Sequence, residues 1–589
     1  MISFIFTFLI ISPLLISNNK DTESKYLTFA LSLSLSYALL GVLGLIFIFF
    51  KITFLPLYLV LIFIFFIITL NNNYRNKLIY LWDKSIEEIK IINKFENYEK
   101  TLKFFYFILF LLFIVSIGPI NHSDTANIYV GYPYKFWIKN SHFIDGNLNQ
   151  GLMGIGDFAN IFYFQENTTW LIRTSQFIPL LILFFYLLKR KISNLYFFIF
   201  LTSPVFIQWL TIGKNNFLSE SCLALSFLIW EKNKDIKYLP SIFSIIFIAI
   251  SFKISAIIVS IPIILYIIFY YRKSLISIRF KNILNFISLP LYLSLIILLV
   301  IFFYRYFLMD NPFYPLFSKF FNPENQQLFD WEQTLRGWDR NGLFPLWLFI
   351  PKTIGKISFV LGPSNLLLII TSIIYFMRNL ISNNGRLAIG IFQFILLLIF
   401  SQGRADYYMS PLILVSSGLP NLNIKDFRLL NRKFYLILIL RRFLIISVFT
   451  QFMMFLVSSI YSISLVLYVL YDYESGMNKT AYNFYNSREI EKYAEAPVLS
   501  EITGMTHLYS NINFIANQKF DNCIYYDKTI SSKEKYKVCM EREGVKTIIL
   551  EKDKLKNNNS FSCKPRNLIR ASRNIFLEKK LLVDFCKLK

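Results

Sequence analysis

Long apolar blocks recur along this sequence, and they constrain its fold more than any other feature. Phe443 to Leu470 carries no charged side chain, and Leu27 to Phe50 and Leu284 to Phe303 are similarly apolar. Such blocks can cross a bilayer, for which a helix needs roughly 17–25 residues. A chain in lipid must satisfy its own backbone hydrogen bonds, so the blocks predict helices. We reject the alternative, buried helices of a large soluble protein, because the blocks recur along most of the chain and lack a polar face.

The blocks predict a polytopic bundle of fourteen transmembrane helices. Only 16% of the 589 residues are charged, which is low for a soluble protein of this length. The predicted spans are 1–17, 27–50, 53–70, 103–120, 168–188, 193–211, 216–230, 237–251, 254–271, 285–307, 363–377, 387–401, 407–420 and 443–470.

The basic residues orient this bundle. Lys and Arg outnumber Asp and Glu by 61 to 36, a formal charge of +25. In a soluble protein this excess would suggest nucleic acid, but here the basic residues fall in every second loop between spans, so we expect no nucleic-acid partner. The loop 71–102 is basic, whereas 121–167 has more acidic than basic residues. Cytoplasmic loops are rich in Lys and Arg, so both termini are predicted to lie outside. The first span has no basic residue before Lys20 and is read as a retained helix rather than a signal peptide.

The composition becomes polar from Asp472 onward, which predicts a soluble domain. The run Val545 to Leu550 predicts a strand, and Pro497 to Leu499 and Cys523 to Tyr526 are weaker strand candidates. Mixed strands and helical stretches indicate a small α/β domain of roughly 110 residues, within the usual range for a domain.

Four of the five cysteines lie in this tail. An outside compartment is oxidising and allows disulfides. Four cysteines permit three pairings, which a sequence cannot distinguish. Our first expectation is a bond between Cys523 and Cys539, with free thiols as the alternative. The tail cysteines are Cys523, Cys539, Cys563 and Cys586.

Two classes of chemistry find little support in the sequence. Only three histidines exist, which argues against histidine-based metal or triad chemistry, and no cysteine–histidine spacing resembles a zinc site. There is no Gly-rich P-loop, so the chain by itself is not expected to be an ATP-driven transporter.

The first long outer loop holds the most informative residues. Asp124 follows a predicted membrane exit, and either Ser123 or Asp124 could instead cap a helix that starts near Thr125. The stretch Tyr132 to Ile138 is amphipathic, with aromatic residues suited to the lipid interface. A Gly-rich piece, Gly146 to Gly156, then ends in Asp157.

Other polar groups sit at the outer ends of predicted spans. Ionisable groups at membrane depth are costly and usually functional, although Lys253, at a tight outer turn, could simply snorkel outward. Carboxylates and cations gathered on one membrane face make a plausible site for a phosphate-bearing substrate. These residues are Lys214, Asn215, Asn216, Glu220, Lys253, Arg404, Asp406 and Tyr407.

In the order of these features, the region 103–420 resembles the GT-C glycosyltransferases, polytopic enzymes that use polyprenyl-phosphate-linked sugars. Members carry an Asp in the first outer loop, matched by Asp124, before a Tyr-containing amphipathic helix. An Asn-Pro-x-Tyr-Pro element in a later outer loop matches 311–315. The remaining matches are Tyr129, Tyr132 and Trp137, the glycines Gly151, Gly154 and Gly156, and the late group Arg404, Tyr407 or Tyr408, and Pro411.

The sequence also departs from the family pattern. Members often place a second acidic residue in the short outer loop that here reads Lys214-Asn215-Asn216, with Glu220 as a substitute. The resemblance therefore leaves a divalent metal, Mg²⁺ or Mn²⁺, as an option, with Asp124 and Glu220 as candidate ligands. It implies no other cofactor.

The resemblance implies an inverting transfer of a hexose or pentose from a polyprenyl-phosphate donor. Asp124 would be the general base, and Arg404 and Lys253 would stabilise the leaving phosphate. The substrate-binding candidates are Asp157, Tyr129, Lys214, Lys253, Arg404 and Tyr407. The partners implied are the lipid-linked sugar, membrane lipid, and a glycan, lipid or protein acceptor of the envelope.

Three rival functions remain open. A membrane polysaccharide polymerase or ligase typically uses arginines in large outer loops, and the first loop here has none before Arg173. A lipid or glycan transporter often shows inverted repeats and broken helices, which we do not detect in the sequence. The third rival is a non-catalytic assembly protein.

The predicted fold class is mainly α: a GT-C-like membrane bundle of about 14 helices with a small C-terminal α/β periplasmic domain, placed in a bacterial inner (plasma) membrane. The predicted parts are extra transmembrane helices and a cytoplasmic loop (1–102), a catalytic module (103–420) with outer loops 121–167 and 309–362, a cytoplasmic loop with the last helix (421–471), and the periplasmic domain (472–589).

Overall fold

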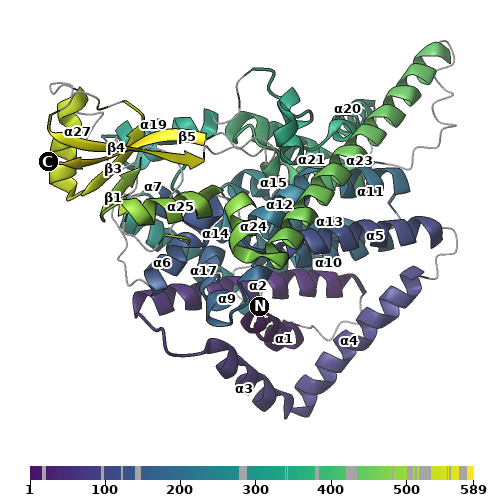
Figure 1. Ribbon diagram of the computed structural model, residues 1–589. Coiled ribbons are helices and arrows are strands. Elements are labelled where there is room, and N and C mark those ends of the chain that lie inside the picture. The colour runs from purple at the N-terminus through teal and green to yellow at the C-terminus, as the bar shows by residue number, and fades with distance from the viewer. Residues whose placement is uncertain are drawn as a thin grey trace.

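The structure is a computed structural model of the chain, drawn in Figure 1. The residues that it describes are 1–15, 22–93, 99–120, 122, 124–138, 148–190, 192–276, 288–324, 326–337, 340, 342–378, 384–419, 434–480, 482–500, 508–510, 514–515, 532–553, 555, 559–569 and 580–589.

Helices occupy every range predicted to span the membrane. They are α1 (Ile2–Leu15), α2 (Thr22–Phe49), α3 (Leu57–Thr69), α5 (Glu99–Ser116), α10 (Phe177–Lys189), α11 (Asn194–Leu201), α12 (Val205–Ile212), α13 (Asn216–Asn233), α14 (Leu239–Phe252), α15 (Ala256–Ile276), α17 (Leu289–Met309), α20 (Pro363–Arg378), α21 (Gly385–Phe400), α22 (Met409–Gly418) and α23 (Phe434–Tyr471).

The number of spans is a separate question from the presence of helices. Within the described residues, five helices are long and apolar enough to cross a membrane, or seven if two bent pairs each count as one span. The other predicted spans correspond to shorter helices, so the count of fourteen stays a prediction. The span 193–211 is divided into α11 and α12, which meet at 46°. Pro204 explains the break, because proline lacks the N–H that would continue the helix.

Short helices fill the connections on the side of the first long loop. They are η2 (Thr125–Tyr129), α6 (Gly131–Ile138), α7 (Leu148–Gly151), α8 (Ile155–Phe158), α9 (Ile161–Gln165), η3 (Thr169–Leu171), η4 (Arg173–Gln176), α18 (Ser318–Phe321), α19 (Gln326–Gly337), η6 (Leu346–Leu348), η7 (Ile354–Phe359), η8 (Ala405–Tyr407) and α24 (Tyr473–Thr480). On the other side lie α4 (Asn72–Asn93) and η5 (Ile236–Tyr238).

Helix α4 lies in a range that the sequence indicated only as a basic loop. It bends by 103° away from α3 and is amphipathic: Tyr74 and Leu81 are buried, while Trp82 is exposed. Glu88 on α4 accepts contacts from Lys189 (3.1 Å) and Lys25 (3.8 Å). The helix therefore joins the basic ends of α10 and α2.

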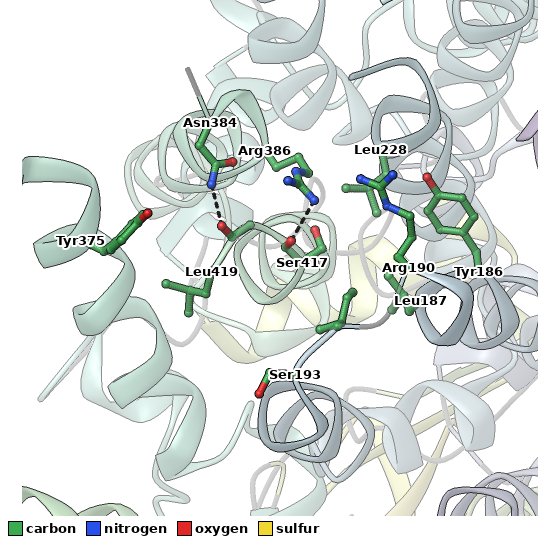
Figure 2. A pocket seen from close by; sticks show the side chains of 12 residues that line it. Tyr186, Leu187, Arg190, Ser193, Leu228, Tyr375, Asn384, Arg386, Ser417 and Leu419 are labelled. Carbon is green, nitrogen blue, oxygen red and sulfur yellow. Dashed lines mark hydrogen bonds between the residues drawn. The ribbon is translucent and has the colours of Figure 1, made fainter. Parts of the chain in front are cut away.

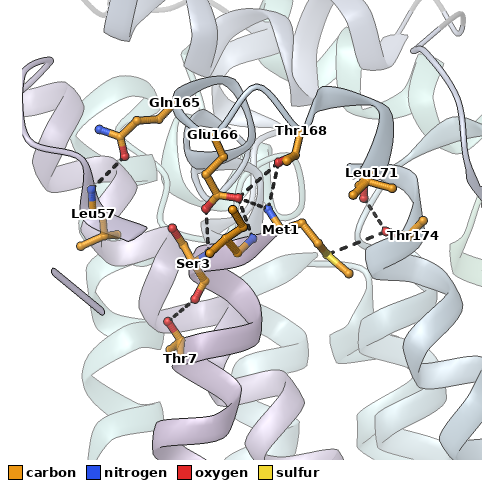
Figure 3. A network of polar contacts seen from close by, with 10 residues as sticks. Met1, Ser3, Thr7, Leu57, Gln165, Glu166, Thr168, Leu171 and Thr174 are labelled. Carbon is orange, nitrogen blue, oxygen red and sulfur yellow. Dashed lines mark hydrogen bonds and ion pairs between the residues drawn. The ribbon is translucent and has the colours of Figure 1, made fainter. Parts of the chain in front are cut away.

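Polar contacts place the N-terminus, the first long loop and the tail on one face of the bundle. The Met1 ammonium lies 2.5 Å from Glu166, which also accepts the backbone N–H groups of Ile2 and Ser3 (Figure 3). From the tail, the Leu508 N–H donates to the Ala126 carbonyl at 3.1 Å, and the Tyr509 hydroxyl donates to the Ile120 carbonyl. This agrees with the alternation of charge in the loops. That this face is periplasmic stays a prediction.

Helix α2 lies inside the bundle and contacts α8, α13 and α14. Two glycines allow its backbone to approach the first loop closely. A Cβ atom at Gly41 would lie 2.0 Å from the Ile155 carbonyl oxygen, and one at Gly44 would lie 2.2 Å from the Phe158 carbonyl oxygen. A helix from the N-terminal part of the chain thus supports α8, which carries Asp157.

The tail forms the predicted α/β domain, drawn in yellow and green in Figure 1. Its strands are β1 (Val498–Ser500), β2 (Phe514–Ile515), β3 (Thr547–Glu551), β4 (Phe561–Ile569) and β5 (Lys580–Leu588), with helices α25 (Tyr482–Tyr493) and α27 (Ser532–Glu543). The sheet order is β2-β1-β3-β5-β4, with β1 parallel to β2 and β3, and β5 antiparallel to β3 and β4. Two predicted strands are confirmed as β3 and β1. The candidate at Cys523 to Tyr526 lies outside the described residues.

The structure contains a disulfide between Cys563 and Cys586, neighbours across β4 and β5. Of the three pairings that the sequence left open, the only one that includes this bond joins Cys523 to Cys539. Cys523 lies outside the described residues, so that bond stays a prediction. Most of the cytoplasmic loop predicted at the start of 421–471 is also outside them.

Candidate functional site

Asp124 and Lys214 form an ion pair between two loops that the sequence separates by 90 residues. Asp124 precedes η2, and Lys214 follows Gly213 in the turn between α12 and α13. Lys214 Nζ lies 3.0 Å from Asp124 Oδ2. The Asp124 carboxylate makes no capping bond to η2, so its interpretation as a helix cap is wrong; Ser123 lies outside the described residues. The Asp124 side chain keeps 41% of its surface exposed, which leaves it accessible.

Aromatic rings hold the two lysines of the site. The Tyr129 ring centroid lies 4.7 Å from Lys214 Nζ, and the Tyr407 ring centroid lies 3.9 Å from Lys253 Nζ. Both are within the range of a cation–π interaction. Lys253 follows the end of α14 and is half-buried, so it does not simply snorkel into solvent. The structure thus brings Tyr129 and Tyr407 to the cations that the sequence also singled out.

Arg404 supplies a third cation from the turn after α21. Its Nε lies 3.1 Å from Asp406 Oδ1. Within the described residues, its Nη2 is buried and has no hydrogen-bond partner. This guanidinium therefore keeps donors that an incoming anion could use.

The charges set the protonation of this cluster. Burial alone would raise the pKa of Asp124, but Lys214, His122 and Arg404 outweigh it and hold that pKa below its usual value. Burial lowers the pKa of Lys253. For Asp406, burial is again outweighed, here by Arg404, Lys253 and Lys214, and its pKa is lowered. Near neutral pH the cluster contains two anionic carboxylates among three basic side chains.

Asp157 lies beside this cluster but is fully engaged by the protein. Its Oδ2 accepts the Gly154 N–H at 2.8 Å, and its Oδ1 accepts the Asn215 amide at 3.0 Å. It is 2% exposed, and burial raises its pKa to about 7. An Asp at position 215 could not donate this bond and would bring two carboxylates together. The amide at 215 therefore suits the structure, and Asp157 holds the loop in place.

Glu220 has a similar supporting position in α13. Its Oε2 accepts the backbone N–H groups of Met409 and Ser410 at 3.1 and 3.2 Å, at the start of α22. Among the described residues, no group of three His, Cys, Asp or Glu side chains could hold a metal. Glu220 is occupied by amides and Asp124 faces a lysine, so this pair does not fit a divalent cation. We derive no step through a metal.

Arg173 positions the first loop, and sequence reasoning missed it. This side chain is 2% exposed and donates to the carbonyls of Val115, Ile117 and Pro119 at 2.9, 2.7 and 3.0 Å. These carbonyls end α5 and begin the loop that carries Asp124. The available signal was that Arg173 is the one charged side chain in the predicted span 168–188.

Two backbone features complete this arrangement. Gly118 has φ +136°, and a Cβ there would lie 2.8 Å from Arg173 Nη2. The Thr125 hydroxyl donates to the Ile212 carbonyl at 2.5 Å. Gly118 leaves room for Arg173, which holds the loop that carries Asp124. The Thr125 hydroxyl joins the same loop to the turn that carries Lys214.

The aromatic residues of α6 are not at a lipid surface, which corrects the sequence interpretation. Tyr132 and Trp137 are 2% and 5% exposed, and the Trp137 Nε1–H donates to the Ile52 carbonyl at 2.9 Å. Protein rather than lipid surrounds Tyr132 and Trp137, because α6 packs against η2, α9 and α2. These residues cannot hold a prenyl chain in this conformation.

The Asn-Pro-x-Tyr-Pro element supports the glycine-rich piece rather than the charged cluster. Asn311 Oδ1 accepts the Phe313 N–H at 2.9 Å, which closes the turn. Tyr314 is fully buried, and a Cβ at Gly151 would lie 2.7 Å from its ring. A Cβ at Gly154 would lie 1.8 Å from the Phe252 carbonyl oxygen. The glycines therefore allow close packing around Asp157.

Comparisons with known proteins place the chain near one solved structure. No protein-family model and no curated protein matches the sequence. One matching structure is titled "Crystal Structure of ArnT from Cupriavidus metallidurans bound to Undecaprenyl phosphate". The similarity covers 83% of this chain and 98% of that chain, with 11% sequence identity and a TM-score of 0.46. A similarity at this level does not establish function, so we base the proposal on the site itself.

Proposed function

We propose that this protein is an integral-membrane glycosyltransferase. It would move a sugar from a polyprenyl-phosphate donor to an envelope glycan, lipid or protein on the outer face of the bacterial inner membrane. One observation carries the proposal: an accessible carboxylate, Asp124, stands among three basic side chains, Lys214, Lys253 and Arg404, on one face of an apolar helical bundle.

The cations suit the phosphate of the donor. Arg404 Nη2 has no partner among the described residues, and Lys253 contacts a ring there rather than an acid. Donors that are already in place where negative charge develops stabilise a transition state without further reorganisation. In the proposed reaction the leaving polyprenyl phosphate gains that charge.

Asp124 would act as the general base. The acceptor hydroxyl oxygen would bond to the anomeric carbon from the face opposite the phosphate, as the bond from that carbon to the phosphate oxygen breaks. The phosphate would keep the electron pair, and the hydroxyl proton would pass to Asp124. This route inverts the configuration at the anomeric carbon.

The ion pair between Lys214 and Asp124 must weaken before Asp124 can accept the proton. A carboxylate whose pKa is held low is a weak base. The donor phosphate can draw Lys214 away from Asp124, which raises the proton affinity of Asp124 when the substrate is bound. Lys214 would thus couple donor binding to activation of the base.

The test is sugar transfer in vitro by the full chain from a synthetic polyprenyl-phosphate sugar. We expect Asp124→Asn to lower kcat by at least about 100-fold, the low end for loss of a general base. Asp330→Asn is the matched control, because Asp330 is an exposed carboxylate on α19 in another outer loop. Full activity of Asp124→Asn at normal abundance would refute the assignment of the base. No transfer by the wild type from any such donor would favour a transporter or assembly protein instead.

Mass spectrometry of envelope glycans and lipid-linked sugars in a deletion strain identifies the substrates. The glycan that loses a sugar names the acceptor, and the lipid that accumulates names the donor. Unchanged glycans and lipids in the deletion strain would contradict the proposal.

A further inference from the structure

A cavity of about 360 Å³, whose lining residues are drawn in Figure 2, opens at the end of the bundle opposite the Asp124–Lys214 pair. Its walls come from α10, α13, α20, α21 and α22 and from the turn that follows α10. Helices α21 and α22 also reach the Asp124 cluster, but with their other ends. Their 16 and 10 residues separate the two places by roughly 15–24 Å at 1.5 Å per residue. The cavity is therefore distinct from the candidate active site.

Two arginines from different helices line this cavity. Arg190, which caps the end of α10, makes no side-chain hydrogen bond or ion pair within the described part of the chain. Arg386, in the first turn of α21, has its Nε 3.3 Å from Glu231 and donates from Nη1 to the Ser417 carbonyl at 3.1 Å. Figure 2 shows both side chains beside the cavity. Among the described residues, these two guanidinium groups have one acid partner, Glu231, which leaves an excess of positive charge at the cavity.

Hydrogen bonds between the Asn384 side chain and the backbone fix one wall of the cavity. The Asn384 amide donates to the Gly418 carbonyl at 2.6 Å, and its oxygen accepts the Leu387 N–H at 3.4 Å. These bonds join the start of α21 to the end of α22. The arginine on this wall is thereby held in position before any ligand arrives.

We propose that this cavity binds the phosphate-bearing headgroup of an anionic membrane lipid. A planar guanidinium with free donors suits phosphate, which it can bind through two hydrogen bonds. The volume is at the small end for ligand pockets, enough for a headgroup rather than a whole lipid. Basic pockets between transmembrane helices on the cytoplasmic side are typical sites for acidic headgroups. The basic loops on this side of the bundle agree with that placement.

The experiment uses the full chain, purified in a neutral detergent and stripped of lipid. Phosphatidylglycerol is titrated in, with phosphatidylcholine as the lipid that has no net charge, and inorganic phosphate is the soluble arm. Native mass spectrometry counts the lipids retained, and a thermal shift reports phosphate. We expect phosphatidylglycerol to be retained over phosphatidylcholine. Because one charge-assisted contact is lost, Arg190→Gln should weaken its binding by about tenfold.

Arg272→Gln is the matched control, an exposed arginine at the same end of the bundle that does not line the cavity. Arg190→Gln breaks no bond between described residues, so it tests the site even if Arg386→Gln fails to fold. If inorganic phosphate alone binds and depends on Arg190, the ligand is a soluble phosphate and the lipid assignment is overturned. Equal binding of phosphatidylglycerol by wild type and Arg190→Gln overturns the site. Sugar transfer is not the readout, so this test stands or falls independently of the proposed reaction.

Discussion

Replacing Arg173 by Gln tests whether this buried guanidinium positions the candidate base. Arg173 donates to three carbonyls at the end of α5, and the shorter Gln amide can reach at most one of them. At least two carbonyls, buried or partly buried, then lose their partner, each at a cost of about 1–3 kcal/mol. We expect the free energy of unfolding to fall by about 3 kcal/mol.

The same change should act on catalysis through kcat. A misplacement of about 1 Å at a reacting group can cost roughly 100-fold in rate, whereas the phosphate-binding candidates Arg404 and Lys253 remain in place. We therefore expect kcat to fall and the KM for the lipid-linked donor to stay nearly constant. Arg173→Lys should recover part of the rate, because an ammonium still donates to carbonyls.

Unfolding is measured by SDS titration in mixed micelles, and transfer by the synthetic donor assay. Arg75→Gln is the control: Arg75 is exposed on α4, and its side chain donates a hydrogen bond to Asn72 at 2.8 Å. Surface changes of this kind usually stay within about 0.5 kcal/mol. An Arg173→Gln protein with the stability and kcat of the wild type would refute the positioning role.

Three further perturbations follow from the structure. The pKa of Asp157 is raised to about 7 in the fold, so its contribution to stability is complete below the unfolded pKa of about 4 and is lost as the pH rises through 7. The free energy of unfolding of the wild type should fall by on the order of 4 kcal/mol across this window. The same SDS titration should show a much smaller fall for Asp157→Asn. Gly41→Ala places a Cβ against the Ile155 carbonyl, which should cost about 1–3 kcal/mol by overpacking and lower transfer; an unchanged melting temperature would contradict this close approach. Cys563 and Cys586 close a loop with a sequence separation of 23, so replacing both by Ala should destabilise the tail domain by about 3 kcal/mol. Limited proteolysis should then cleave the tail earlier than in the wild type. A protease-resistance profile identical to that of the wild type would argue against the bond.

The sequence predicted the helices well because bilayer length and apolarity are local properties. It missed α4, whose polar side removes it from the apolar blocks, although its buried residues recur with helical spacing. It also did not show the break at Pro204, because the average apolarity of 193–211 stays high on both sides of the proline.

The sequence predicted which polar residues gather, but only in part how they act. Lys214, Lys253 and Arg404 all follow outer ends of predicted spans, so alternation of the spans brings them to one face. Their partners depend on how helices pack, which apolar blocks do not encode. Tyr132 and Trp137 show the same limit: an amphipathic pattern looks alike whether its apolar side meets lipid or protein.

The close contact of α2 with α8 has a consequence for how the site is assembled during synthesis. Domains and chains fold from the N-terminus as they are made, so α2 enters the membrane before the loop that holds Asp157 exists. The surface of α2 at Gly41 and Gly44 is then already in place when the translocated loop packs against it. Supplying residues 1–102 as a separate polypeptide should restore assembly to a chain that begins at 103, whereas adding them after that chain has been inserted should not.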